Sequence, residues 1–314
     1  MIQVTAARFR GVMGGLEFLD PVIIAGAGHW ALLTAQMAEI DITPSSIVLE
    51  PVARNTAATA YLAAETAKAL DPDALVLLLP ADHVIAKPEA FLAAIGRAVA
   101  TAQDRIVTFG VMPDRPETGY GYIQQGGALA EEVYAIARFR EKPKREEAEA
   151  LLAAGGHLWN AGIFLFAPAV AIAAFDHAPE IRTAVQAALA QARREGAVTL
   201  LPEALFAATP ALPFDVAVME RTTRSAVVPC QIGWADVGSW SELWALSPKD
   251  PHGNVTMGPV ALIDCENCLV FSDGPPVAVA GLNAMIVVAT KAGTVTLPMD
   301  RAQDVKPLLA KLQG

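Results

Sequence analysis

Two aspartates that lie far apart in the chain have the surroundings expected of metal ligands. Asp82 follows an unbroken apolar run at residues 75–79 and then Pro80. Because proline cannot donate a hydrogen bond to a neighbouring strand, the expected strand ends there, and Asp82 lies at the carboxyl edge where open α/β sheets bind ligands. Asp236 lies in the glycine-bent segment W-A-D-V-G-S-W. The two carboxylates could hold one Mg²⁺ beside a phosphate group, whereas the alternative is that Asp82 only caps a turn.

Charged side chains elsewhere could bind the rest of a phosphorylated ligand. Arg54 lies in E-P-V-A-R-N-T, residues 50–56, between an expected strand and an expected helix whose N-terminus favours anions. Glu141 and Lys142 stand side by side after another expected strand, where they could take sugar hydroxyls and a phosphate. The same pair could instead be solvated charges that contribute little to stability.

Two glycine-containing stretches could bring the backbone close to a ligand. P-E-T-G-Y-G-Y spans residues 116–122, and W-N-A-G-I spans residues 159–163. Glycine permits such close approach because it carries no side chain. Taken singly, each of these stretches is more typical of an ordinary turn than of a binding site, and the same holds for W-A-D-V-G-S-W.

A competing motif points to a different chemistry. G-A-G-H-W-A at residues 26–31 fits the dinucleotide pattern G-x-G-x-x-A, and Glu50 ends the next expected strand. It would indicate an NAD-dependent oxidoreductase, and the alternative is a plain strand-to-helix turn, which the other motifs favour. The pair Cys265-x-x-Cys268 has no second pair near it. A structural zinc ion needs four ligands, so we expect no zinc or redox site there.

Composition limits the class of protein. The chain has 314 residues, of which 54% are hydrophobic and 18% charged, as in a compact protein with one large and one small domain or two medium ones. A net charge of −10 makes a nucleic-acid partner unexpected. No apolar run is suited to span a bilayer, and the first residues lack the order of a signal peptide, so we expect a cytoplasmic protein without a membrane partner. Three cysteines do not suit a disulfide framework.

Strand and helix patterns alternate over the first third of the chain. The expected elements there are 21–25, 29–40, 46–49, 55–70, 75–79, 88–103 and 105–110. Such alternation predicts βαβ units and a mainly parallel sheet. The region 1–15 is expected to hold the end of a helix and a glycine turn, 168–195 to be mostly helical, and 302–312 to form a closing helix. From residue 252 onward, short apolar pieces separated by turn residues predict a small all-β unit of solenoid type.

The motifs taken together resemble a known family. L-E-P-x-x-R-N-T-A, L-P-A-D-H, P-E-T-G-Y-G-Y-I, F-x-E-K-P, W-N-A-G-I-F-L-F, F-D-x-A-V-M-E and W-x-D-V-G-S-W follow one another as in mannose-1-phosphate guanylyltransferases. The resemblance implies an α/β fold, a Rossmann-like nucleotidyltransferase mixed sheet flanked by helices, in domain 1–248, and a small solenoid-like β domain with a closing helix in 249–314. It also implies that GTP and mannose 1-phosphate are converted to GDP-mannose and pyrophosphate, with Mg²⁺ as cofactor.

The resemblance implies a role for each matching residue. Asp82 and Asp236 would bind the metal and, with Lys142 on the sugar phosphate, form the catalytic set. The guanine nucleotide would be held by Glu50, Pro51, Arg54, Asn55, Thr56, Pro80, Ala81 and Asp82. The mannose phosphate would be held by Gly119, Tyr120, Glu141, Lys142, Asn160, Gly162 and Asp215. The reaction would be in-line attack of the sugar phosphate oxygen on the α-phosphorus of GTP.

One departure from the family pattern opens an alternative. The family begins with a strand and a glycine-rich loop, G-G-x-G-T-R-L-W-P-L-S-R, which this sequence does not contain. That loop would supply donors and cations around the triphosphate, so a sugar-nucleotide-binding remnant without turnover is the alternative function. The β tail could also pair two subunits into a homodimer.

Overall fold

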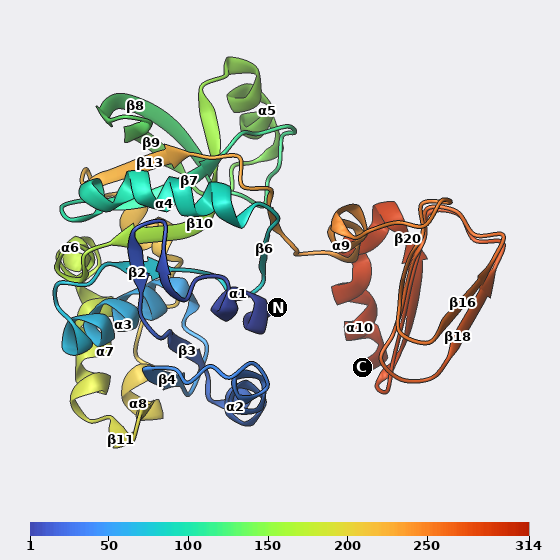
Figure 1. Cartoon of the computed structure of the whole chain (residues 1–314), viewed down its shortest axis with the longest axis horizontal. Coiled ribbons are helices and arrows are strands. Elements are labelled where there is room, and N and C mark those ends of the chain that lie inside the picture. Colours follow the sequence, from blue (N-terminus) through green and yellow to red (C-terminus); the bar gives the residue numbers. More distant parts are fainter. Residues whose placement is uncertain (314) are drawn as a thin grey trace. The chain divides into compact units, whose positions relative to one another are not determined.

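The computed structural model describes residues 1–313 and divides the chain into two compact units (Figure 1). The first unit is Met1–Trp234, and the second begins at Ala235. This division falls before the boundary expected at residues 248 and 249. The reason is that helix α9 (Trp240–Leu246) packs against the core of the second unit through Trp240, Leu243 and Trp244.

A six-stranded sheet forms the centre of the first unit. Its order is β5 (Val76–Leu78), β10 (His157–Phe166), β7 (Ile106–Val111), β13 (Ser225–Pro229), β9 (Val133–Arg140) and β8 (Tyr122–Ala130). The pair β7–β13 is parallel, whereas β10 runs antiparallel to both β5 and β7. The mixed sheet is confirmed, but the prediction of a mainly parallel sheet is wrong here. The chain leaves β7, passes through the β8–β9 hairpin and a helix at Arg145–Ala154, and returns as β10 in the opposite direction, so a single helical crossover does not join β7 to β10.

A second, four-stranded sheet carries the first strands of the chain. Its order is β11 (Arg193–Glu195), β12 (Val198–Leu200), β4 (Ser46–Glu50) and β3 (Val22–Gly26), and β12, β4 and β3 run parallel. Strands β3 and β4 were predicted. The end of region 168–195 was expected to be helical, but it enters β11, because it forms an antiparallel hairpin with β12.

Helices cover both faces of the central sheet (Figure 1). Helix α4 (Pro88–Ala102) packs on one face, where Val107 and Phe109 are buried. Helices α3 (Asn55–Leu70), α6 (Pro168–Ala174) and α7 (Pro179–Ala190) pack on the other face, against Ile106 and Phe164. Seven residues of α3 are fully or almost fully buried, and five of these are alanines, which let the helix lie close to its neighbours.

Short elements complete the first unit. They are α1 (Ile2–Ala7), β1 (Gly11–Met13), β2 (Leu16–Phe18), η1 (Ala27–His29), α2 (Trp30–Ala38), β6 (His83–Ile85), α5 (Arg145–Ala154), η2 (Phe175–His177), α8 (Glu203–Phe206) and the π-helix η3 (Asp215–Met219). The glycine turn expected in region 1–15 is the tip of the β1–β2 hairpin, where Gly14 and Gly15 have φ of 58° and 78°. Such angles favour glycine.

The second unit is a small parallel solenoid. Strands β15 (Val255–Met257), β17 (Leu269–Ser272) and β19 (Met285–Thr290) pair in parallel, as do β16 (Val260–Ile263) and β18 (Val277–Ala280). Strand β20 (Gly293–Pro298), η4 (Met299–Asp304) and the closing helix α10 (Val305–Gln313) follow. The solenoid prediction is confirmed. Cys265 and Cys268 are buried in its interior with Val270 and Val287.

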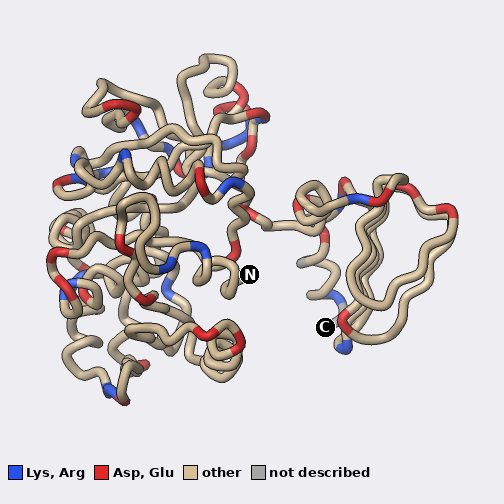
Figure 2. The backbone as a smooth tube through the Cα atoms, in the orientation of Figure 1, with Lys and Arg blue, Asp and Glu red and all other residues tan. Residues whose placement is uncertain are grey.

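Charge is spread along both units. Figure 2 shows Asp and Glu interspersed with Lys and Arg along the backbone. Within residues 1–313, none of the helices has the length and apolar character needed to cross a membrane.

Candidate functional site

Three segments of the first unit meet at Glu141, Asn160 and Asp215, and we call these residues with their neighbours the sugar side, after the ligand predicted for them. Gly121 is the contact point, because a Cβ there would lie 2.8 Å from Glu141 Oε2 and 3.3 Å from Asn160 Cβ. The Asn160 N–H also donates to the Gly121 carbonyl at 2.8 Å. The structure therefore brings together the loop of Gly119 and Tyr120, the end of β9 and the middle of β10.

A chain of hydrogen bonds runs through the sugar side. Asn160 Nδ2 donates to Asp215 Oδ1 at 2.8 Å, and Thr108 Oγ1 donates to Asn160 Oδ1 at 2.7 Å. Thr108 and Asn160 are both buried. The pairing of β10 with β7 shifts register between Asn160 and Phe164, and Gly162 has a φ of 67° within this bulge. The bulge re-aims the strand at Asn160.

The sugar side holds two carboxyl groups whose acidity is weakened. Burial, followed by the charge of Glu141, raises the pKa of Asp215 to about 7. Burial also raises the pKa of Glu141. The Lys142 ammonium group, with Nζ 3.3 Å from Glu141 Oε1, opposes this rise. The backbone N–H of Glu141 donates to Glu220 Oε1 at 3.0 Å, and Lys142 has a φ of 43°. Perturbed acidity and unusual backbone angles are both typical of functional sites.

The segment predicted to hold the nucleotide, residues 50–56, lies at the start of α3. Asn55 has a φ of 61°, and its side chain accepts a hydrogen bond from the Thr56 N–H at 2.8 Å. Glu50 accepts a hydrogen bond from Thr59 at 2.9 Å, and burial raises the pKa of Glu50. Arg54 donates to the carbonyl of Ala207. Pro51 is half-buried beside them.

This segment is tied to the sugar side through the backbone before Asp215. The Phe214 N–H donates to Thr56 Oγ1 at 2.9 Å, and the Ala57 N–H donates to the Leu212 carbonyl at 3.1 Å. The Thr56 hydroxyl oxygen thus serves the protein's own structure. The two predicted subsites are joined by direct bonds, a link that spacing along the chain could not indicate.

The tip after β5 is more open. Pro80 is half-buried, and Ala81 and Asp82 are exposed. His83 next to them accepts a hydrogen bond from Trp234 Nε1 at 3.1 Å. Trp234 also meets the Tyr120 ring, with ring centres 4.9 Å apart, so this tip and the sugar-side loop share an aromatic contact.

Two tryptophans that were not predicted as ligands, Trp159 and Trp234, lie against the predicted ligand Tyr120. Tyr120 lies edge-on to Trp159 with ring centres 5.2 Å apart, and the Arg115 guanidinium lies 5.1 Å from the Trp159 ring centre. Each of these tryptophans, Trp159 and Trp234, is the first residue of a motif singled out from the sequence, W-N-A-G-I or W-A-D-V-G-S-W, so the sequence did indicate their neighbourhood.

Asp236 belongs to the second unit, at the end of β14 (Trp234–Asp236). The prediction that Asp82 and Asp236 share a metal therefore stays a prediction. Among residues 1–313, His, Cys, Asp and Glu nowhere gather in threes to form a ready metal cage. Magnesium ions commonly bind through one or two carboxylates together with substrate phosphates, and the exposed carboxylate of Asp82 fits that mode.

The G-A-G-H-W-A motif folds as a strand, a short 3₁₀ turn and a helix. A Cβ at Gly26 would lie 3.3 Å from His29 Nδ1, so the absence of a side chain at Gly26 makes room for His29.

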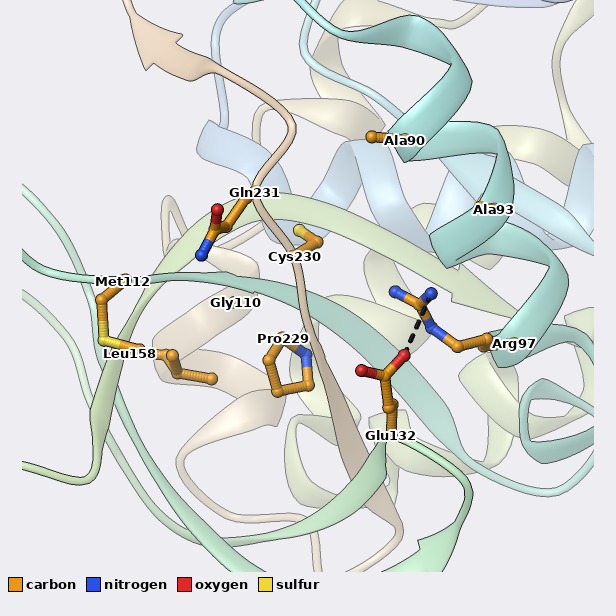
Figure 3. A pocket seen from close by; sticks show the side chains of 10 residues that line it. All are labelled: Ala90, Ala93, Arg97, Gly110, Met112, Glu132, Leu158, Pro229, Cys230 and Gln231. Carbon is orange, nitrogen blue, oxygen red and sulfur yellow. Dashed lines mark ion pairs between the residues drawn. The ribbon is translucent and has the colours of Figure 1, made fainter.

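A cavity of about 450 Å³ lies between α4 and the end of β13 (Figure 3). Arg97 and Glu132, which both line it, form an ion pair with Nη1 and Oε2 3.2 Å apart. Burial raises the pKa of the Cys230 thiol to about 12, so this wall of the cavity is uncharged at neutral pH. The residues that line this cavity differ from the site residues predicted above.

Comparison with known proteins agrees with this fold and with the family expected from the motifs. A Klebsiella pneumoniae protein and an Escherichia coli protein, each named mannose-1-phosphate guanylyltransferase, are both 40% identical over 311 residues, 98% of this chain and 65% of the relative. The chain thus spans about two thirds of the length of these relatives. A solved structure from Thermus thermophilus, described as a mannose-1-phosphate geranyltransferase, has 31% identity and a TM-score of 0.79, and covers 93% of this chain and 84% of that one.

Two family models divide the chain between them. Residues 258–312 match the MannoseP isomerase/GMP-like beta-helix domain, which agrees with the solenoid. The resemblance to mannose-1-phosphate guanylyltransferases is confirmed, and the comparisons give no support to an NAD-linked function. Because the nucleotidyl transferase model matches residues 1–253, including both predicted subsites of the first unit, the chain belongs to the nucleotidyl transferase family.

Proposed function

We propose that this protein transfers GMP from GTP to mannose 1-phosphate, giving GDP-mannose and pyrophosphate. The observation that carries the proposal is the meeting of Glu141, Asn160 and Asp215, from three separate elements, beside the Lys142 ammonium group. The names of the relatives supply the substrates: two of them are guanylyltransferases that act on mannose 1-phosphate.

The sugar side suits a hexose phosphate. Carboxylate and amide groups can accept from and donate to several hydroxyls at once, Gly119 and Gly162 allow close approach of the ring, and the Tyr120 side chain would pack beside it. Lys142 would bind the phosphate as a point charge. Its position next to Glu141 keeps the hydroxyl-binding and phosphate-binding groups on one segment.

The nucleotide side would be formed by the start of α3 and the tip after β5. The N-terminal N–H groups of a helix favour phosphate, and Arg54 adds a positive charge there. Pro80 and Ala81 would line the base and ribose. The remaining nucleotide ligands in the proposal are Glu50, Pro51, Asn55 and Thr56.

Asp82 and Asp236 would hold Mg²⁺ together with the phosphate oxygens of GTP. The metal would neutralise the charge on the triphosphate while the sugar phosphate oxygen attacks the α-phosphorus in line. The protein's own contribution would be positioning: Lys142 and the sugar side hold the attacking phosphate, and the start of α3 holds the nucleotide.

Turnover tests the proposal directly. The chain is incubated with GTP, mannose 1-phosphate and Mg²⁺, and pyrophosphate release is measured, with EDTA, omission of the sugar phosphate, and a K142A variant as controls. We expect release that depends on all three components and falls at least tenfold in K142A, whereas K144A, a change at an exposed neighbour, keeps it. GDP-mannose binding without pyrophosphate release would overturn the transferase proposal, and so would turnover independent of the sugar phosphate.

We further propose a cytoplasmic location, without a nucleic-acid partner. All three cysteines, Cys230, Cys265 and Cys268, are free thiols, which is typical of a reducing compartment. The acidic net charge and interspersed charges argue against a nucleic-acid surface (Figure 2). Homodimer formation through the β unit is the corresponding proposal for assembly, and light scattering after size-exclusion chromatography would test it.

A further inference from the structure

Thr108 is a buried polar residue in the middle of β7 that no motif singled out. Its neighbours Val107 and Phe109 are apolar, and all three residues are completely buried. A hydroxyl in such surroundings destabilises the fold unless it is hydrogen-bonded. Thr108 is also at the far end of the hydrogen-bond chain that reaches Asp215 through Asn160. We therefore ask what the Thr108 hydroxyl contributes to the hydrogen bonds between Thr108, Asn160 and Asp215.

The Thr108 hydroxyl has one hydrogen and two acceptors within reach. Asn160 Oδ1 lies 2.7 Å away, and the Ile163 carbonyl lies 2.9 Å away. A threonine hydroxyl donates once but can accept as well. It can therefore either donate to the amide of Asn160 or, if it donates to Ile163, accept from that amide.

These two choices correspond to opposite orientations of the Asn160 amide. When Thr108 donates to Oδ1, the amide nitrogen faces Asp215, and its N–H meets Oδ1 of the carboxylate at 2.8 Å. When the amide is turned, its oxygen faces that carboxylate, so that two acceptors meet inside the protein. Such a contact is unfavourable while Asp215 is ionised.

We propose that Thr108 is a positioning residue of the sugar side: its hydroxyl holds the Asn160 amide with the nitrogen toward Asp215 and so fixes the pattern of donors and acceptors offered to the hexose. This inference rests on the proposed function, because it assigns Asn160 to the sugar. Thr108 touches no substrate in this account and acts only through Asn160. Removal of the Thr108 hydroxyl should therefore lower the affinity for the sugar-containing ligand, GDP-mannose, and leave the affinity for GDP unchanged.

The test compares the affinities of GDP and GDP-mannose, measured by isothermal titration calorimetry. T108V keeps the shape of the side chain and removes the hydroxyl, whereas T108S keeps the hydroxyl. T209V is the matched control, because Thr209 is also buried and its hydroxyl has no hydrogen-bond partner among the described residues. We expect T108V to bind GDP-mannose about tenfold more weakly, as for loss of one buried donor, and GDP within about twofold of wild type. T108S and T209V should stay within about threefold for both ligands.

Every outcome decides between the alternatives. T108V that weakens both ligands equally, or neither, overturns the inference, because a merely structural role would not separate them. If T108V does not fold, as judged by circular dichroism, T108C replaces it: its weaker donor should reduce GDP-mannose affinity selectively, and wild-type affinity in T108C would overturn the inference. A wild-type chain that does not bind GDP-mannose contradicts the proposed function itself, and the inference falls with it, whereas a wild-type chain that binds GDP-mannose without the selective loss in T108V contradicts the inference alone.

Discussion

The sugar side and the tip after β5 differ in how far their side chains are fixed by other protein groups. On the sugar side, Asn160 and Asp215 are bonded to each other and supported by a buried threonine, so their geometry exists before any ligand arrives. At the tip, Asp82 is exposed to solvent. If the proposed function holds, the groups that bind the sugar are preorganised, whereas the tip completes its charge neutralisation only with the ligand and the proposed metal. Four experiments would break or sharpen this comparison.

The largest effect is expected at the exposed tip. D82N removes a charge without removing buried contacts, so turnover should fall about 100-fold or more while the melting temperature stays within about 1 °C. D73N, which changes another exposed aspartate, is the control and should leave both unchanged. Steady-state pyrophosphate release and thermal unfolding measure the two quantities. Turnover of D82N close to wild type would remove Asp82 from the metal site.

A substitution on the sugar side should change KM for one substrate only. D215N replaces the carboxylate that receives the Asn160 amide, and we expect KM for mannose 1-phosphate to rise about tenfold while KM for GTP changes less than about twofold. Steady-state kinetics with each substrate varied in turn gives both values. An equal rise in both KM values would show that the two sides are not separable.

The same residue should make stability depend on pH. The pKa of Asp215 is raised to about 7 from 3.8 by burial and by Glu141, with Lys142 and Asn160 opposing, so the folded chain holds this proton more tightly than the unfolded chain. Its contribution is therefore present below the unfolded pKa and is lost as the pH rises toward 7. The melting temperature of D215N minus that of wild type should grow by about 2–4 °C between pH 4 and pH 7 and then level off. A constant difference would contradict the raised pKa.

The bond that joins the two sides should give a smaller effect. T56V removes the acceptor of the Phe214 N–H, and we expect a loss of about 1–2 kcal/mol in the free energy of unfolding, measured by urea denaturation. KM should rise for both substrates by a few-fold at most. T34V, at an exposed helical threonine, is the control. A free energy of unfolding in T56V equal to that of wild type would contradict the role of this bond in joining the two sides.

Local patterns predicted the helices and strand ends of the site, but not its supporting bonds. Helices α3 and α4 were predictable because apolar spacing and, in α4, a proline in the first turn are local signals. The antiparallel insertion of β10 between β5 and β7 was not, because strand order depends on contacts between distant segments. Thr108 was missed for the same reason: its partner is 52 residues away in the sequence, and a threonine inside an apolar strand is typical of any β-sheet.

The bulge in β10 separates two tasks that one strand performs. Beyond it, Phe164 and Phe166 pack on one face of the sheet, and Ile163 and Leu165 pack on the other. Before it, Asn160 faces the sugar side. Because the register shift uncouples the two halves of the strand, a substitution in the first half can change what surrounds Asn160 while the second half continues to anchor the domain. If Asn160 binds the sugar as proposed, changes in hexose preference should map to this first half.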